Sequence, residues 1–188
     1  MNMKSFKLLA LLSALLLLGG CADMKMTRDL YDDWWPIHAT GSFDNGHFTA
    51  NYDSDLGARG GLIITFTNKA DPTMQYTDTW YFNALSFDKN RKNFKYITIK
   101  NLQYESSRQL KYYIKDKKIY FEIMDEAGRG TGEYEKGKDI KFIGDDRVLI
   151  DGVTYERYAA YRLRKALDKD EKLLPIEPDG RIPISVYR

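Results

Sequence analysis

The sequence predicts an all-β domain: an antiparallel up-and-down meander of about ten short strands that closes into a small barrel. Runs of alternating apolar and polar residues are separated by clusters of Gly, Asp, Asn and Lys. Two of these joints are Asn45-Gly46 and Asp151-Gly152, which favour the type I′ turns of tight hairpins. The sequence shows neither βαβ alternation nor an internal repeat, which argues against a parallel sheet.

Composition excludes several functional classes. The 188 residues include 29 Lys and Arg against 27 Asp and Glu, so a strongly basic nucleic-acid binder is not expected. A single cysteine excludes an internal disulfide framework and a multi-cysteine metal site. Fourteen Tyr and nine Phe are too many for a disordered chain and suffice for a packed core.

Residues 1–20 read as a lipoprotein signal peptide. Lys4 and Lys7 precede an apolar run, Leu8–Leu18, which is too short for a membrane span of about 20 residues. Leu18-Gly19-Gly20-Cys21 then resembles the lipobox of bacterial lipoproteins. The resemblance implies cleavage before Cys21, acylation of that cysteine, and a mature chain with 27 basic and 27 acidic residues. An ordinary secretory signal or an uncleaved anchor is the alternative.

The residues after the lipobox indicate where the lipid anchor resides. Residues 21–26 are expected to form a lipidated tether. Residue 22 is Ala, whereas an Asp there commonly retains Gram-negative lipoproteins in the inner membrane, so outer-membrane anchoring is expected. The acidic run that directs Bacteroidetes-type lipoproteins to the cell surface is missing after Cys21. A periplasm-facing position follows, with the membrane as the first partner.

The β-barrel domain is expected to span residues 27–158. Residues 27–34 predict a short helical turn with Thr27 as its N-cap. Strands 36–43 and 47–53 then form a hairpin in which Asp44 pairs with His47. That register gives one apolar face and places His38 opposite Asp53 on the polar face.

Further strands follow at close spacing. They are expected at 62–68, 75–87, 94–102, 108–115, 118–124, 130–136, 139–144, 147–150 and 153–158. The Asp151-Gly152 turn pairs Val148 with Tyr155 on one face and Arg147 with Glu156 on the other, as an exposed ion pair.

The last segment, residues 159–188, is expected to form a helix over 159–173 and an extended tail. Apolar residues at helical spacing predict the helix: Leu163, Ala166, Leu167 and Leu174. Pro175, Pro178 and Pro183 then impose an extended conformation.

This arrangement resembles the lipocalin (calycin) superfamily over residues 27–173. The shared features are a short N-terminal helical turn, a tryptophan entering the first strand, a long meander and a late helix. Asp32-Asp33-Trp34-Trp35 matches the tryptophan of the family's Gly-x-Trp motif without its glycine. Thr77-Asp78-Thr79-Trp80 is similar to the family's Thr-Asp-Tyr motif but lies much earlier in the chain. The resemblance implies a barrel that binds a small apolar molecule.

Catalytic and metal chemistry find little support in the sequence. His38 and His47, the only histidines, lie far apart in the predicted hairpin, so no metal site is expected. The nucleophile motif Gly-x-Ser-x-Gly is missing, and the carboxylates fall mostly at turns. The segment 57–61 offers backbone N–H groups to an anion beside Arg59, with a plain connector as the alternative. We therefore expect a non-enzymatic protein without a cofactor.

The aromatic residues are the best indication of function. One set on the alternating strands fills the core, and another is available to line a cavity. The expected ligand-lining residues are Trp34, Trp80, Phe82, Tyr96 and Tyr112. The leading interpretation is a barrel that binds a small apolar or amphipathic ligand. The alternative is an accessory lipoprotein with a side-chain-filled barrel that docks on an envelope protein through its C-terminal helix and tail.

Overall fold

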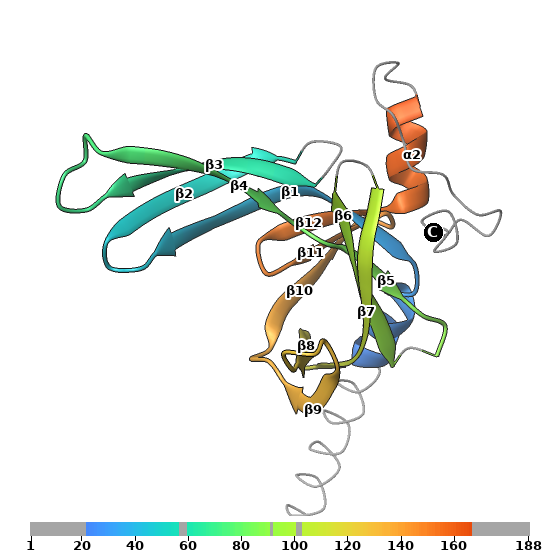
Figure 1. Cartoon of the computed structure of the whole chain (residues 1–188). Helices are drawn as coiled ribbons and strands as arrows, with labels where there is room; N and C mark the ends of the chain where they lie inside the picture. Colours follow the sequence, from blue (N-terminus) through green and yellow to red (C-terminus); the bar gives the residue numbers. More distant parts are fainter. Residues whose placement is uncertain (1–21, 57–59, 91, 101–102, 167–188) are drawn as a thin grey trace, which may run out of the picture.

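The computed structural model describes residues 22–56, 60–90, 92–100 and 103–166 (Figure 1). Residues 22–29 form an N-terminal helix, and Tyr158–Ala166 form α2. Between them lie β1 (Asp33–Asp44), β2 (Phe48–Asp55), β3 (Gly61–Asn68), β4 (Gln75–Tyr81), β5 (Ala84–Phe87), β6 (Asn93–Lys100), β7 (Gln103–Lys115), β8 (Lys118–Met124), β9 (Gly130–Tyr134), β10 (Lys138–Ile143), β11 (Arg147–Ile150) and β12 (Val153–Arg157). Neither helix of these described stretches is long and apolar enough to cross a membrane.

Eight of the strands close into an antiparallel barrel, as the sequence predicts. Their order is β1-β5-β6-β7-β8-β10-β11-β12, and β12 pairs back onto β1. Apart from two excursions, each strand neighbours the one that precedes it in the chain, which makes the barrel up-and-down. The first excursion is β2–β4, and the second is β9, which pairs only with the end of β8.

The first excursion forms an arm that the sequence did not separate from the barrel. The second half of β1 leaves the barrel and pairs with β2, and β3 and β4 extend this sheet away from the barrel (Figure 1). The predicted strand 75–87 is therefore two strands: β4 pairs with β3 in the arm, whereas β5 pairs with β1 and β6 in the barrel. Phe82 and Asn83 form the joint between them.

The two predicted hairpins had different outcomes. The Asp151-Gly152 turn is confirmed, with φ values of 50° and 80° and the expected pairs Val148–Tyr155 and Arg147–Glu156. The Arg147–Glu156 ion pair forms, but it is not the exposed pair that was expected, because Glu156 is buried. The first hairpin's register was wrong by two residues, since Asp44 pairs with Thr49. The Asn45 side chain accepts hydrogen bonds from the backbone N–H groups of His47 and Phe48, which supports a wider turn. A slip of two residues leaves the predicted faces unchanged.

The N-terminal helix begins earlier than predicted. Thr27 is not its N-cap, because the Thr27 hydroxyl donates to the Asp23 carbonyl inside the helix. Residues 22–26, which the sequence assigned to the tether, are helical. The Asp23 carboxylate accepts the backbone N–H groups of Asp116 and Lys117 at 3.1 and 3.3 Å, which fastens the helix to the β7–β8 turn.

Hydrophobic side chains fill most of the barrel interior. Trp34 points inward and is fully buried, while its neighbour Trp35 points outward and packs against Tyr158 and Tyr161 of α2, with ring centroids 5.5 and 5.6 Å away. The interior cluster comprises Leu30, Trp34, Leu85, Phe87, Phe94, Leu110, Tyr112, Ile119, Phe121, Ile140, Val148, Ile150 and Tyr155. Because successive side chains of β1 point to opposite faces of the strand, Trp34 packs in the core and Trp35 packs against α2.

Arg157 ties together the end of the barrel beside the N-terminal helix, where it also lines a pocket of about 430 Å³. Its guanidinium lies 4.7 Å from the centroid of the Trp34 ring and donates to the Asp32 carboxylate at 2.6 Å. It also donates to the backbone carbonyls of Asp29 and Asp145 at 3.0 and 2.9 Å. One side chain therefore connects β12, β1, the N-terminal helix and the β10–β11 turn.

Replacing Arg157 with Met should lower the free energy of unfolding by about 2–4 kcal/mol. The variant keeps an apolar side chain over Trp34 but loses the charge-assisted hydrogen bonds and the cation–π contact. Denaturant unfolding measures the change. Arg129→Met is the matched control, because Arg129 is 80% exposed and pairs only with a turn carboxylate, so its loss should cost under about 1 kcal/mol. Equal effects of the two variants would contradict this role of Arg157.

Candidate functional site

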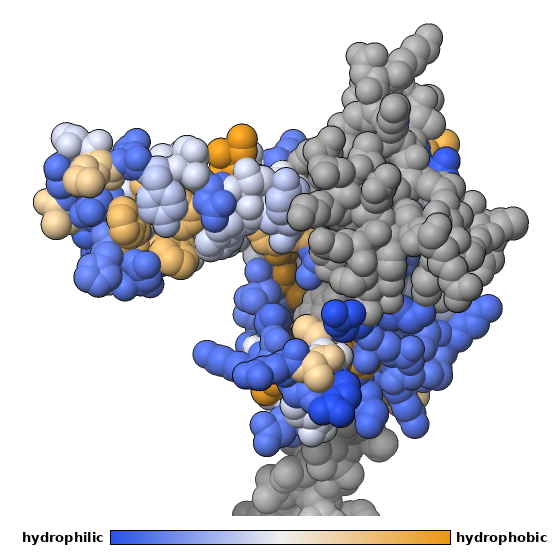
Figure 2. Space-filling view, in the orientation of Figure 1, coloured by the Kyte–Doolittle hydropathy of each residue, from blue (hydrophilic) through white to orange (hydrophobic). Residues whose placement is uncertain are grey.

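A pocket of about 310 Å³ opens where the barrel meets the root of the arm. We call it the mouth pocket; it is lined by Tyr52, Tyr81, Phe82, Asn83, Leu85, Phe121, Lys138, Ile150, Asp151, Val153 and Tyr155. Beneath the root of the arm, Figure 2 shows hydrophobic residues in a hollow that hydrophilic ones surround. Along β12, Val153 lines this pocket, while Arg157 at the other end contacts the N-terminal helix. The mouth pocket therefore lies at the end of β12 opposite Arg157.

The mouth pocket depends on a turn held tightly against β1. The Gly152 carbonyl accepts the backbone N–H of Thr40 at 2.9 Å, at the point where β1 leaves the barrel for the arm. A Cβ on Gly152 would collide with the Thr40 carbonyl, and its φ of 80° already favours glycine. The turn can approach β1 this closely only with glycine at position 152.

The pocket has an apolar floor and a charged rim. Leu85, Phe121, Ile150 and Tyr155 belong both to the barrel core and to the pocket lining. At the rim, the Lys138 ammonium lies 2.8 Å from a carboxylate oxygen of Glu135, 3.9 Å from Asp151, and 5.6 Å from the centroid of the Phe121 ring. A ligand with an apolar body and one polar end would match this arrangement.

The five predicted ligand-lining residues lie in different places. Phe82 lines the mouth pocket. Trp34 and Tyr112 are buried in the interior cluster, and Trp80 packs in the arm against Phe43, Tyr52 and Phe66. Tyr96 pairs with Leu85 and Arg108 in the backbone ladder, and its side chain lies outside the described residues. Ligand contact by any of the five stays a prediction.

Four aromatic residues that line the pocket beside Phe82 were not among the predicted ligand-lining residues: Tyr52, Tyr81, Phe121 and Tyr155. Tyr155 and Tyr52 come from β12 and β2, which lie far apart in the sequence. The alternating pattern places each of these two tyrosines on the apolar face of its hairpin, so the sequence indicates that each points toward the interior. That they face one common hollow depends on how the arm folds back to the barrel, which no local pattern encodes.

His38 connects two carboxylates on the polar face of the arm. Its Nε2 lies 2.7 Å from Asp53, and its Nδ1 lies 3.0 Å from Asp55, which faces His38 in the strand pairing in place of the predicted Asp53. The hydrogen bond to Asp55, followed by that to Asp53, raises the pKa of the His38 ring above its ordinary value. His47 is exposed at the turn. Within the described ranges no group of three His, Cys, Asp or Glu residues is arranged to hold a metal ion.

Turn carboxylates act mainly as local hydrogen-bond acceptors. Asp125 accepts the Arg129 backbone N–H at 2.8 Å, which lowers the pKa of its carboxyl group. Asp44 likewise accepts the Gly46 N–H, and this bond lowers its pKa. The candidate anion cradle at 57–61 falls largely outside the described residues, which resume at Gly60.

The barrel has no identified relative. Comparisons with protein-family models, curated proteins and solved structures find no match to this chain. The strand pairings establish an eight-strand antiparallel barrel. Any function has to be argued from the chemistry of the pockets of this chain.

Gly152→Ala should destabilise the protein by roughly 2–4 kcal/mol, because it adds left-handed backbone strain to a collision with the Thr40 carbonyl. Gly46→Ala is the matched control: Gly46 has a φ of 87°, but a Cβ there meets nothing within 4 Å, so about 1–2 kcal/mol is expected. Thermal and denaturant unfolding compare the two. A smaller loss at Gly152 than at Gly46 would rule out the close approach.

Stability should fall by up to about 1 kcal/mol as pH rises from about 6 to about 8, and His38→Gln should remove this change. The pKa of His38 in the folded protein lies above the ordinary histidine value of 6.5, so its contribution to stability is complete below pH 6.5 and is lost as pH rises through the folded-state pKa. Unfolding midpoints of wild type, His38→Gln and the control His47→Gln measure it. A wild-type pH dependence that survives in His38→Gln would refute the assignment.

Proposed function

We propose that this chain is a non-enzymatic lipoprotein, anchored through Cys21 in the outer membrane and facing the periplasm, whose barrel binds a small apolar or amphipathic molecule. The observation that carries the proposal is an open pocket with an apolar floor at the end of the barrel away from Arg157. The similarity of the predicted architecture to lipocalins points to the same kind of ligand.

The size and polarity of the mouth pocket restrict the ligand class. Ligand pockets commonly measure about 300–1,000 Å³, so a pocket of about 310 Å³ suits a molecule with one ring system or one short chain. Phe82, Phe121 and Tyr155 supply apolar walls for its body. Lys138 and Asp151 at the rim favour a polar group at the exposed end.

The N-terminal helix supports a defined orientation on the membrane. Cys21 directly precedes the helical residues 22–29, and Asp23 fastens the start of that helix to the β7–β8 turn. The helix lies at the Arg157 end of β12, whereas the mouth pocket lies at the Val153 end. A lipid on Cys21 would therefore hold the Arg157 end of the barrel near the membrane and leave the mouth pocket directed away from it.

The ligand proposal is tested with full-length protein extracted from its native host in detergent. We expect mass spectrometry to find a co-purifying small apolar or amphipathic molecule, and the fluorescent probe N-phenyl-1-naphthylamine to compete for its site. Phe82→Glu should weaken probe binding at least about tenfold, because it places a charge in the apolar pocket. Ile63→Glu, at an exposed arm position, is the matched control and should leave binding unchanged. A folded wild type that neither carries a molecule nor binds the probe would contradict the proposal.

The anchor is tested separately by metabolic labelling with palmitate. Cys21→Ser should abolish label incorporation and release the protein from the membrane fraction. Unchanged membrane association of this variant would contradict anchoring through Cys21 without affecting the ligand proposal.

The arm favours docking on an envelope protein as a second candidate function. Within the described strands β4 pairs only with β3, and six of its seven residues are exposed, Trp80 being the exception. Such an edge can accept a strand from another protein. A photo-crosslinking residue at Thr77 should capture a partner in intact cells, whereas one at Glu133 of β9 should not. Equal capture at both positions, or none at Thr77, would dismiss this candidate.

A further inference from the structure

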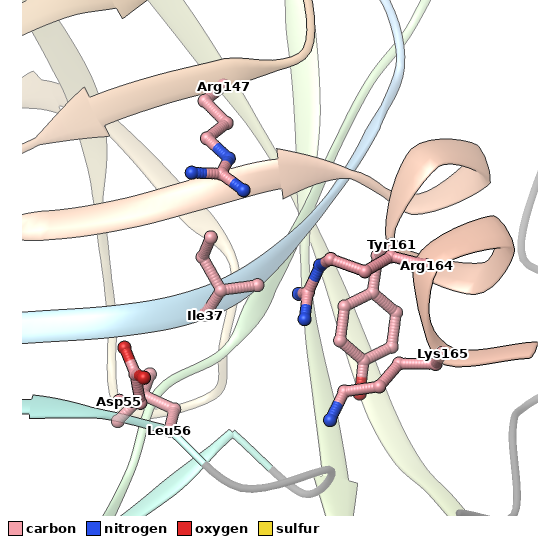
Figure 3. Close-up of a pocket in the computed structure, with 7 residues that line it drawn as sticks. All are labelled: Ile37, Asp55, Leu56, Arg147, Tyr161, Arg164 and Lys165. Atoms are coloured by element: carbon pink, nitrogen blue, oxygen red, sulfur yellow. The ribbon is translucent and has the colours of Figure 1, made fainter. Parts of the chain in front are cut away.

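A second pocket, of about 270 Å³, lies outside the barrel wall, between α2 and the point where the arm begins. We call it the cationic pocket; it is lined by Ile37, Asp55, Leu56, Arg147, Tyr161, Arg164 and Lys165 (Figure 3). Arg147 comes from β11, and Arg164 and Lys165 come from α2. In Figure 3 the nitrogen atoms of all three side chains are directed toward the same space beside Ile37.

A buried carboxylate positions the two arginines. Glu156 accepts the Nε and Nη2 groups of Arg147 on Oε1, at 3.2 and 3.1 Å. Its other oxygen accepts the same two groups of Arg164, at 3.1 and 2.8 Å. Arg164 also lies 5.5 Å from the centroid of the Tyr161 ring. Both guanidiniums are therefore held in orientation before any ligand arrives, which lowers the entropic cost of binding.

Each arginine retains donors for a ligand. The contacts with Glu156 use one edge of each guanidinium, and among the described residues neither Nη1 group has a hydrogen-bond partner. Glu156 is only 4% exposed, whereas the two arginine side chains are about half exposed, at 46% and 45%. The negative charge is thus covered, and the positive charges face the pocket.

The balance of charge favours an anion. Among the described side chains that line the pocket or position its arginines, Arg147, Arg164 and Lys165 carry three positive charges, and Glu156 and Asp55 carry two negative ones. Asp55 lies on the opposite wall and contacts the His38 ring at 3.0 Å. Planar or tetrahedral oxyanions suit the forked donors of arginine, which bind carboxylate and phosphate oxygens in pairs.

We propose that the cationic pocket binds a small oxyanion, a carboxylate or a phosphate group, through Arg147, Arg164 and Lys165. Glu156 acts as a positioning residue that orients the two guanidiniums. Ile37, Leu56 and the Tyr161 ring offer apolar surface for a short carbon chain on the anion. This site is distinct from the mouth pocket, with which it shares no lining residue.

Equilibrium dialysis of the full-length protein in detergent, at constant ionic strength, tests the proposal. The probes are radiolabelled inorganic phosphate and radiolabelled succinate. We expect saturable binding of one equivalent of at least one probe, and the tighter probe identifies the anion as phosphate or carboxylate. Saturable binding of neither probe to folded wild type would overturn the proposal.

Variants of the lining test the site itself. Lys165→Gln leaves the contacts of both arginines with Glu156 intact, whereas Arg147→Gln removes the Arg147–Glu156 ion pair. Each variant should raise the dissociation constant of the bound anion about tenfold. Asp55→Asn should lower it about threefold, because it removes the opposing charge. Arg129→Gln, an exposed arginine elsewhere, should change it less than about twofold. Unaltered binding in Lys165→Gln and Asp55→Asn would overturn the assignment of this pocket.

Phe82→Glu separates this inference from the proposed ligand site. The variant should lose the apolar probe from the mouth pocket and keep oxyanion binding. Loss of both would show that the anion binds at the mouth, and would overturn the cationic pocket as its site.

Discussion

The contact of Arg157 with Trp34 closes the seam on which the rest of the barrel depends. β1 and β12 are the first and last barrel strands, and their pairing creates an interior instead of an open sheet. Arg157 lies on the ring of Trp34 and hydrogen-bonds to the N-terminal helix and to the β10–β11 turn.

β1 serves both the barrel and the arm, and this shared strand positions the mouth pocket. Its first half pairs with β5 and β12, and its second half pairs with β2. The chain leaves the barrel there and returns through Phe82 and Asn83, so residues of the arm's root meet residues of the barrel's interior. The Asp151-Gly152 turn braces the junction through the Thr40 hydrogen bond. The insertion thus supplies one wall of a pocket that the barrel alone would lack.

Strand alternation lets one wall serve two pockets of opposite character. On β12, Tyr155 points inward to the apolar mouth pocket, while its neighbour Glu156 points outward and holds the arginines of the cationic pocket. On β1, Trp34 fills the core and Trp35 packs against α2, which carries Arg164 and Lys165. Because successive side chains alternate between faces, neither pocket requires strands of its own.

The sequence by itself determined the features that depend on neighbouring residues. Alternation and turn chemistry predicted β8 and β11 to the residue, and the φ requirement of Asp151-Gly152 set the register of the last hairpin. The faces of the first hairpin survived a slip of two residues for the same periodic reason. Only the tertiary structure decided four other features. They are the division of the predicted strand 75–87 at Phe82, the hydrogen bonds of Asp23 to the β7–β8 turn, the second carboxylate at His38 and the ion pair of Arg164 with Glu156. Each depends on which segments become neighbours in space, and barrel closure chooses those neighbours through contacts among residues far apart in the chain.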